Sequence, residues 1–186
     1  MERFERYYRS LFNVSLAINS SLEFKEVLQT VAKEVTEAMQ VKGSFIRLLD
    51  REGKTLLPSA SYGLSERYLR KGPVEVEKSA VDREAISGKT AVIEDVTRDE
   101  RFQYPEEAKA EGLVSMLVLP LQAKGDFIGV LRLYAAERRE FDTEEREFAT
   151  SIAALSAVAL ENARLHQTLK RDYEHLASFE YRIFED

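Results

Sequence analysis

The chemistry that this sequence offers centres on one arginine inside an apolar segment. Arg47 stands in the run Ser44–Leu49, directly between Ile46 and Leu48. A guanidinium in such surroundings can bind an anionic ligand group bidentately, because its N–H groups form a fixed fork that fits a carboxylate or a phosphate. The alternative is that Arg47 faces solvent or pairs with a carboxylate of the chain. The residues around it leave both roles open.

Two other patterns resemble chemical motifs but are better explained as structure. The segment Ser87–Thr90 reads SGKT, like the end of a phosphate-binding loop, but Arg83 stands where the opening glycine should be. The segment also runs from a helix into a strand, which is the reverse of such a loop. His166 and His175 lie too far apart on the last helix to share a face as an i, i+4 metal pair would. We therefore expect no metal site.

The residues needed for covalent catalysis are also missing. The chain has no cysteine, which excludes thiol nucleophiles, thiolate metal ligands, disulfides and thioether-linked chromophores. No serine stands in a GxSxG motif. Most carboxylates fall at helix starts or on charged faces, so the sequence gives no support for a pair of carboxylates acting as general acid and general base. The sequence predicts a protein that is not an enzyme and has no catalytic residues.

Size and charge limit the remaining possibilities. The chain has 186 residues, of which 44% are hydrophobic and 32% charged, as expected for one compact domain with helical extensions. Its net charge of −6 argues against a general nucleic-acid binder, which needs a basic face. No apolar run approaches the roughly 20 residues of a membrane span, and the N-terminus has no apolar signal core. We expect a cytoplasmic protein that binds neither nucleic acid nor membrane.

The apolar pattern predicts a mainly antiparallel sheet with helices on its faces. Strands are expected at 44–49, 56–62, 73–77, 90–93 and in a hairpin over 112–134. Helices are expected at 2–19, from about 20 to 39, at 80–87, from about 105 to 111 and from about 143 almost to the end of the chain.

Capping residues and one glycine predict details of these elements. Ser20 with Glu23 has the pattern of a capping box at the start of the second helix, and Asp142 with Glu145 has it at the start of the last. Gly129 lies inside the second strand of the 112–134 hairpin, where a missing side chain lets a neighbouring element approach closely.

The order and spacing of several segments resemble those of the GAF domain family, a family of small sensory domains. The segments are SFIRLLD at 44–50, ASYGL at 60–64, AISGKTAVIEDV at 85–96, the hairpin 112–134 and ENARL at 161–165. The resemblance covers roughly residues 20–166. It implies an α+β fold with a six-stranded antiparallel sheet. The terminal helices pack on one face, and a ligand pocket with short helices lies on the other.

The resemblance also restricts the reactions and ligand classes that fit this chain. An enzymatic branch of the family reduces free methionine sulfoxide with cysteines, and bilin-carrying members usually attach their pigment through cysteine; this chain has none. Members that bind cyclic nucleotides carry an Asn-Lys…Phe…Asp-Glu pattern. Phe141 and Glu144-Glu145 match its end, but Tyr134-Ala135-Ala136 stands where Asn-Lys is expected, so cyclic nucleotide binding is in doubt. The cofactor and the ligand stay unknown.

By the resemblance, the pocket lies between the sheet and the segment from about Ser79 to Gly112. The aromatic, apolar and polar side chains expected to line it are Phe45, Arg47, Ile93, Asp95, Phe102, Tyr104, Ser115 and Leu117. Phe45 shares a strand face with Arg47, and Ser115 shares one with Leu117, because side chains alternate along a strand. The alternative is that the bulky aromatic residues fill the pocket, which would leave a ligand-free dimerisation or docking module of the same fold.

A seven-residue repeat in the last helix predicts a coiled coil. Its members are Phe148, Leu155, Asn162, Leu169, Leu176 and Ile183. Residues after about 166 lie beyond the domain core, so we expect a parallel homodimer. The first helix joins the interface through Phe4, Tyr8 and Leu11. This divides the chain into a dimerisation helix (1–19), a sensory domain (20–166) and a coiled-coil extension (167–186).

The combined interpretation is a non-catalytic signal-transduction domain. A small molecule orders the segment between Ser79 and Gly112 over the sheet, and this shifts the terminal helices of the dimer. The sequence contains no kinase, cyclase or DNA-binding motif, so the output belongs to a partner signalling protein or to a domain outside this chain.

Overall fold

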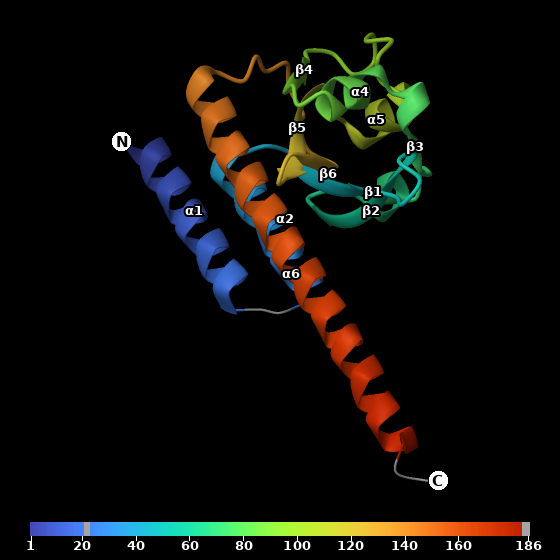
Figure 1. The fold of residues 1–186 in the computed structure, drawn as a ribbon. Coiled ribbons are helices and arrows are strands. Elements are labelled where there is room, and N and C mark those ends of the chain that lie inside the picture. Colours follow the sequence, from blue (N-terminus) through green and yellow to red (C-terminus); the bar gives the residue numbers. More distant parts are fainter. Residues whose placement is uncertain (21–22, 184–186) are drawn as a thin grey trace.

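Six strands form one sheet between two layers of helices in the computed structural model of the chain (Figure 1). The structure describes residues 1–20 and 23–183, without the side chains of 167 and 175–183. The strand order is β3-β2-β1-β6-β5-β4, and every neighbouring pair is antiparallel. The predicted six-stranded antiparallel α+β fold is therefore confirmed.

The two central strands approach each other closely at one glycine. The strands are β1 (Gly43–Leu49), β2 (Thr55–Tyr62), β3 (Val74–Glu75), β4 (Ala91–Ile93), β5 (Ser115–Ala123) and β6 (Asp126–Ala135). A Cβ atom added to Gly129 on β6 would lie 2.2 Å from the backbone oxygen of Arg47 on β1. The close approach predicted at Gly129 is confirmed, and the glycine lets the central strands pair beside Arg47.

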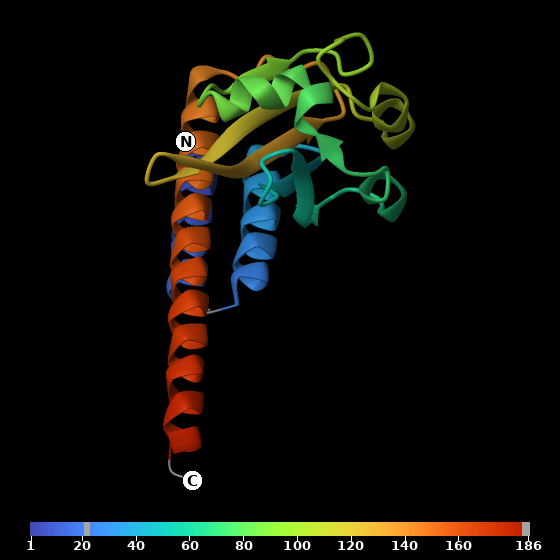
Figure 2. The ribbon, with the colours of Figure 1, turned by 45° about the vertical axis from the view of Figure 1, so that its right-hand side comes forward.

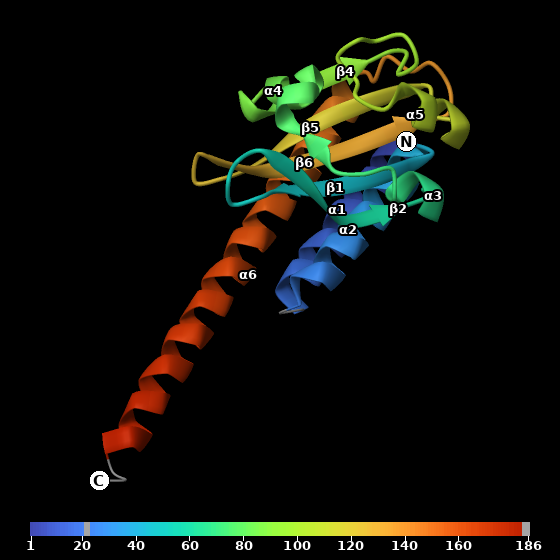
Figure 3. The same cartoon turned by 90° about the vertical axis from the view of Figure 1, so that its right-hand side faces the viewer.

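Three long helices lie on one side of the sheet, with α2 and α6 packed on its face and α1 packed on those two helices (Figures 1 and 3). They are α1 (Glu2–Ser20), α2 (Phe24–Met39) and α6 (Thr143–Ile183). The rings of Tyr7 on α1 and Phe148 on α6 stack with centroids 4.0 Å apart. Ile46 of β1 and Leu131 of β6 belong to the buried apolar core under these helices. The terminal helices thus lie on the same side of the sheet, α6 directly against it and α1 outside α2 and α6.

Short helices cover the opposite face, on the far side of the sheet from α6 in Figure 3. They are α3 (Glu66–Leu69), the 3₁₀ turn η1 (Val76–Lys78), α4 (Ala80–Ile86) and α5 (Pro105–Glu111). A second buried apolar cluster lies beneath them and includes Phe45, Val130 and Tyr134 of the two central strands. The central strands therefore send alternate side chains into two separate cores.

One of the two predicted capping boxes is present. The backbone N–H of Glu145 donates to Asp142 Oδ1 and that of Asp142 donates to Glu145 Oε2, each at 2.9 Å. The prediction at Ser20 is wrong, because α1 continues through Ser20 and the N-cap of α2 is Glu23. Residues 21–22 of that pattern lie outside the described residues.

The last helix extends well past α1 and α2 (Figure 2). Of the residues predicted for a dimer interface, Phe4, Tyr8 and Leu169 are 59%, 73% and 69% exposed. Asn162 is also exposed. Leu11 and Leu155 are partly buried against the helical core. The backbone of α6 includes Leu176 and Ile183, whose side chains lie outside the described residues.

Candidate functional site

Four of the residues predicted to line a pocket meet in one core on the short-helix side of the sheet. Phe45 and Arg47 of β1 point into this core, and Arg47 is fully buried. Ile93 of β4 and Phe102 in the loop before α5 are buried in the same core. Tyr104 lies at its edge, and its hydroxyl donates to the backbone oxygen of Pro73 at 2.6 Å.

The other three predicted residues lie elsewhere. Leu117 belongs to the core under the long helices, and Ser115 is paired with Ala135 of that same face. The hydroxyl of Ser115 donates to the backbone oxygen of Glu137 at 2.8 Å. Asp95 is partly exposed and accepts hydrogen bonds from the backbone and hydroxyl of Thr97, which lower the pKa of its carboxyl group.

The prediction of which β5 side chains point to the short-helix side was therefore wrong by one residue. Met116 and Val118 point into the core on the short-helix side, in the place predicted for Ser115 and Leu117. The error arose because the strand is buried on both faces, so its apolar residues do not alternate with polar ones.

Two guanidinium groups lie within this core. Arg47 on β1 and Arg132 on β6 are 0% and 1% exposed. Arg47 Nη1 donates to the backbone oxygen of Leu56 at 3.0 Å, and its guanidinium carbon lies 4.1 Å from the centre of the Phe45 ring. Burial, followed by the positive charge of Arg132, lowers the pKa of Arg47 to about 10. Among the described residues, Arg47 has no carboxylate partner.

The second guanidinium is paired. Arg132 Nη2 forms a buried ion pair with Asp82 on α4, and the hydroxyl of Ser79 donates to the same carboxylate oxygen. Burial lowers the pKa of Arg132, but the Asp82 carboxylate and the nearby Tyr134 raise it by more, so the group stays charged. This ion pair links α4 to the central strand β6, in addition to the packing of Val81 and Ala85 in the core.

A lysine follows α3 and points its ammonium into the same core. Lys71 Nζ lies 3.3 Å from the centre of the Tyr68 ring and 5.5–5.9 Å from those of Phe102, Tyr104 and Tyr134. Burial, and then the charges of Arg132 and Arg47, lower the pKa of Lys71 to about 5. Lys71 is therefore neutral at pH 7 in this arrangement.

The polar atoms of this core are largely without hydrogen-bond partners. In the described part of the chain, eight buried side-chain nitrogen or oxygen atoms lack a partner, and seven of them lie here. They belong to six residues, which we call the cationic cluster: Arg47, Tyr68, Lys71, Asp82, Arg132 and Tyr134. The eighth atom is the hydroxyl of Ser10 on α1. Such concentration marks the cluster as the candidate site, because each buried unpaired polar group costs about 1–3 kcal/mol.

Polar contacts hold the loops that cover the cluster. Arg101 pairs with Asp99 at 2.6 Å and Glu84 at 3.0 Å, and its Nη2 donates to the backbone oxygen of Val92 at 3.1 Å. These contacts join the loop before α5 to α4 and β4. Gly72, next to Lys71, has a φ of +116°, a conformation that favours glycine.

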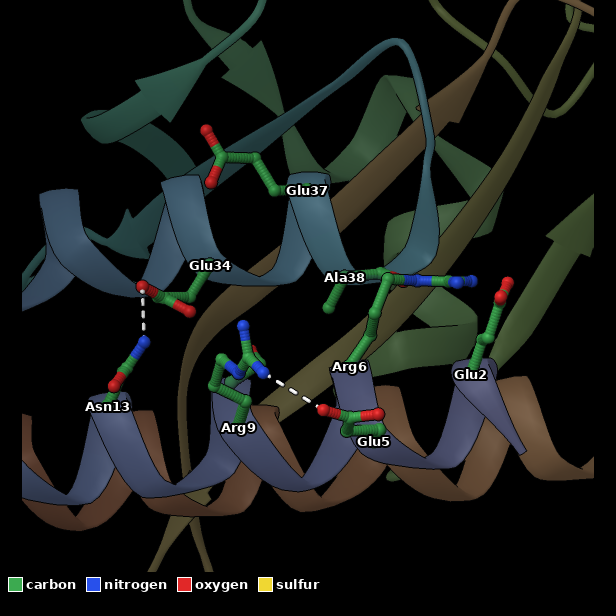
Figure 4. Close-up of a pocket in the computed structure, with 9 residues that line it drawn as sticks. Glu2, Glu5, Arg6, Arg9, Asn13, Glu34, Glu37 and Ala38 are labelled. Atoms are coloured by element: carbon green, nitrogen blue, oxygen red, sulfur yellow. Dashed lines mark hydrogen bonds and ion pairs between the residues drawn. The ribbon is translucent and has the colours of Figure 1, made fainter.

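Two surface grooves lie away from the cluster. One, of about 430 Å³, runs between α1 and α2 (Figure 4), where Asn13 donates to Glu34 and Arg9 pairs with Glu5. The other, of about 930 Å³, lies between α6 and the strands β1 and β6 and includes Leu48 among its walls. Most charged residues of the first groove already have partners within the chain, including Tyr62 for Glu37 and the Ala38 backbone oxygen for Arg6, so we do not assign the ligand to it.

Sequence reasoning found Arg47 and missed the rest of the cationic cluster. Arg132 stands inside the apolar strand FIGVLRLY in the way that Arg47 stands inside SFIRLL, so the same signal was present. Lys71 and Asp82 occur in polar stretches and gave no such signal. Within the described residues, no helix is both long and apolar enough to cross a membrane, and no three His, Asp or Glu side chains gather as metal ligands.

Comparisons with known proteins agree with this fold. A transcriptional activator of formate hydrogenlyase from Salmonella typhimurium (strain LT2) is 25% identical over 174 residues, which is 91% of this chain and 25% of that protein. The methyl sulfide methyltransferase-associated sensor of Methanosarcina acetivorans is 27% identical over 158 residues, or 82% of this chain and 16% of the sensor. The chain thus spans a quarter or less of the curated relatives it matches.

Solved structures show the same fold at low identity. The GAF domain of a phosphoenolpyruvate-protein phosphotransferase from Coxiella burnetii has a TM-score of 0.78 at 17% identity, covering 88% of this chain and 98% of that domain. The free methionine-R-sulfoxide reductase from Neisseria meningitidis has a TM-score of 0.72 at 18% identity, covering 86% of this chain and 91% of that enzyme. A family model described as GAF domain matches residues 21–161, well over half of the sequence. The chain therefore belongs to the GAF domain family, a family of sensor-type signalling domains.

Proposed function

We propose that this chain is a non-catalytic sensory module that binds a small molecule at the cationic cluster and signals as a homodimer through α1 and α6. The observation that supports ligand binding is the concentration of unpartnered buried donors beneath α4. A fold keeps unsatisfied polar groups where function needs them. The absence of cysteine supports a binding role over thiol chemistry.

The dimer is supported by apolar side chains on two neighbouring helices. On α1, Phe4, Tyr8, Phe12 and Leu16 are more than half exposed at four-residue spacing. On α6, Val158, Leu165, Leu169 and Tyr173 are also half exposed or more. We assign these faces to a second copy of the chain, because the projecting part of α6 continues the seven-residue repeat with little of its own chain to cover it.

The relatives suggest how the signal is used. One is named a transcriptional activator and another a sensor, and this chain spans a minor part of each. We infer that the module works in the cytoplasm and regulates a partner protein or an output domain outside this chain. Its net charge of −6 favours a protein partner over nucleic acid.

A second candidate is a ligand-free docking module of the same fold. The observation that favours it is the position of the Lys71 ammonium among four aromatic rings, where the side chain itself occupies the core. In this alternative the cluster is a structural feature, and the dimer faces alone carry the function.

Native mass spectrometry of the purified protein, repeated after denaturation, tests both parts of the proposal. We expect a dimer with extra mass that denaturation releases. A double variant, Tyr8→Glu with Leu169→Glu, should be monomeric, since two buried charges would face the partner. The control is Lys54→Glu on the exposed β1–β2 turn, which makes the net charge more negative by the same amount as the double variant. This control should stay dimeric. A bare dimer favours the docking module, and a wild-type monomer overturns the proposed signalling route.

A further inference from the structure

We propose that the ligand of the cationic cluster is a small anion, a carboxylate or an inorganic oxyanion, held between Arg47, Lys71 and Arg132. This inference rests on the proposed function and names the chemical class of the ligand.

The charges of the cluster do not balance without a ligand. With Lys71 neutral, the cluster's charges are the two guanidinium groups of Arg47 and Arg132 and the one carboxylate of Asp82. One oxygen of this carboxylate is already shared between Arg132 and the Ser79 hydroxyl. Arg47 therefore keeps a buried positive charge without a carboxylate partner in the described residues. A buried charge is stable when it is paired, so the missing partner is negative.

The unpartnered atoms are mostly hydrogen-bond donors. They are the Nε and Nη2 atoms of Arg47, the Nε of Arg132, the Nζ of Lys71 and the hydroxyls of Tyr68 and Tyr134. The Tyr134 hydroxyl also interacts with Tyr68 and Arg132, so Arg47 and Lys71 carry most of the argument. The remaining atom, Oδ1 of Asp82, is an acceptor. A carboxylate or an oxyanion offers only acceptors, and its several lone pairs can take N–H and O–H bonds at once. A cationic ligand would add positive charge beside two guanidinium groups.

Lys71 is the basic side chain best placed to adjust to a ligand. It lies in the loop between α3 and β3, where its ammonium rests on the ring of Tyr68, and Gly72 follows it in a left-handed conformation. The charged and titratable groups around its ammonium are Arg47, Tyr68, Asp82, Tyr104, Glu107, Arg132 and Tyr134. Because burial and the two arginines keep the free lysine neutral at pH 7, a bound anion should raise its pKa and draw a proton from solvent.

The first measurement is anion binding at constant ionic strength. Formate, acetate, succinate, phosphate and sulfate serve as probes, with chloride as the reference salt, in thermal unfolding and calorimetric titrations. Arg47→Met keeps a side chain of similar shape without the charge, and it should weaken binding by roughly tenfold or more. Arg70→Met is the matched control, because Arg70 is next to Lys71 in sequence but its side chain is 81% exposed. This variant should bind the anion like the wild type.

The probes distinguish the two sources of the anion. Binding of carboxylates but not of phosphate or sulfate identifies an organic acid, and the reverse identifies an oxyanion.

Lys71→Met is the second variant, because Arg47 lies at the centre of the sheet and its replacement must first be shown to fold by circular dichroism. For the wild type, affinity should fall by up to about tenfold per unit rise in pH, with proton uptake, and Lys71→Met should lose this dependence.

Three results would overturn the anionic ligand. One is equal affinity of the wild type, Arg47→Met and Lys71→Met for a bound anion. The second is the absence of stabilisation by any probe together with no anionic mass released from the purified protein. The third is the release of a neutral molecule on denaturation, in which case the sensory function still stands. A protein with no releasable mass and no dimer would count against the proposed function itself.

Discussion

The buried ammonium of Lys71 makes the stability of the ligand-free protein depend on pH. Its pKa is lowered to about 5, first by burial and then by the charges of Arg132 and Arg47. In an unfolded chain a lysine has a pKa of about 10.4. Between these values the unfolded chain binds one proton more than the folded protein. The free energy of unfolding therefore rises as the pH rises through this window, and this contribution is lost as the pH falls toward 5.

One proton corresponds to about 1.4 kcal/mol per pH unit, so Lys71 alone should add about 3 kcal/mol to the free energy of unfolding between pH 6 and pH 8. Lys71→Met keeps most of the side-chain stem and removes the titrating group. The surrounding groups that remain in both proteins are Arg47, Tyr68, Asp82, Tyr104, Glu107, Arg132 and Tyr134. Their contributions cancel to first order in the difference between wild type and variant.

The assay is urea unfolding of both proteins at pH 6, 7 and 8, at one ionic strength and after the protein has been freed of ligand. At each pH we compare the free energy of unfolding of Lys71→Met with that of the wild type. This difference, variant minus wild type, should be about 3 kcal/mol larger at pH 6 than at pH 8. Arg70→Met, whose side chain is exposed, should follow the wild-type curve. Parallel curves for the wild type and Lys71→Met would show that the lysine is charged in the folded state and would refute the reasoning.

Two further predictions concern the frame that holds the cluster. Gly129→Ala should cost about 3 kcal/mol or more in urea unfolding, because its Cβ would lie 2.2 Å from the Arg47 backbone oxygen. Gly125→Ala, in an open turn at φ +90°, should cost only about 1 kcal/mol of backbone strain. Asp142→Ala removes the cap whose Oδ1 accepts from the Glu145 N–H and should cost about 1–2 kcal/mol in thermal unfolding; an unchanged melting temperature would contradict the capping box.

The sheet could be predicted because its hairpins carry local signals. The turn at Lys124-Gly125 separates two apolar runs, and Gly129 breaks the second run where a strand must come close. The Asp142–Glu145 capping box is equally local, since both partners lie within one helical turn. The pattern at Ser20 failed because α1 continues through Ser20, whose hydroxyl donates to the backbone oxygen of Ala17 within that helix.

The site was harder to predict because its residues are brought together from distant segments. Arg47 was visible as a charge within an apolar strand. Asp82 and Lys71 are charges among other charges in the sequence, and they become buried only when α4 and the loop after α3 pack on the sheet. The side to which each β5 residue points could not be predicted for a different reason. The residues from Met116 to Leu119 are all fully buried, so apolar and polar residues do not alternate along the strand.

The position of the two arginines connects the cationic cluster to the helical layer. Arg47 stands between Ile46 and Leu48, which pack toward the core under α2 and α6, and Arg132 stands in the same way between Leu131 and Leu133. Both strands occupy the centre of the sheet and pair with each other along β1. A ligand that pulls either guanidinium must therefore act on the strand that also forms the floor of the helical core. The same two strands carry the two guanidinium groups on one face and pack against α2 and α6 on the other, so the proposed ligand and the proposed dimer would be coupled through them.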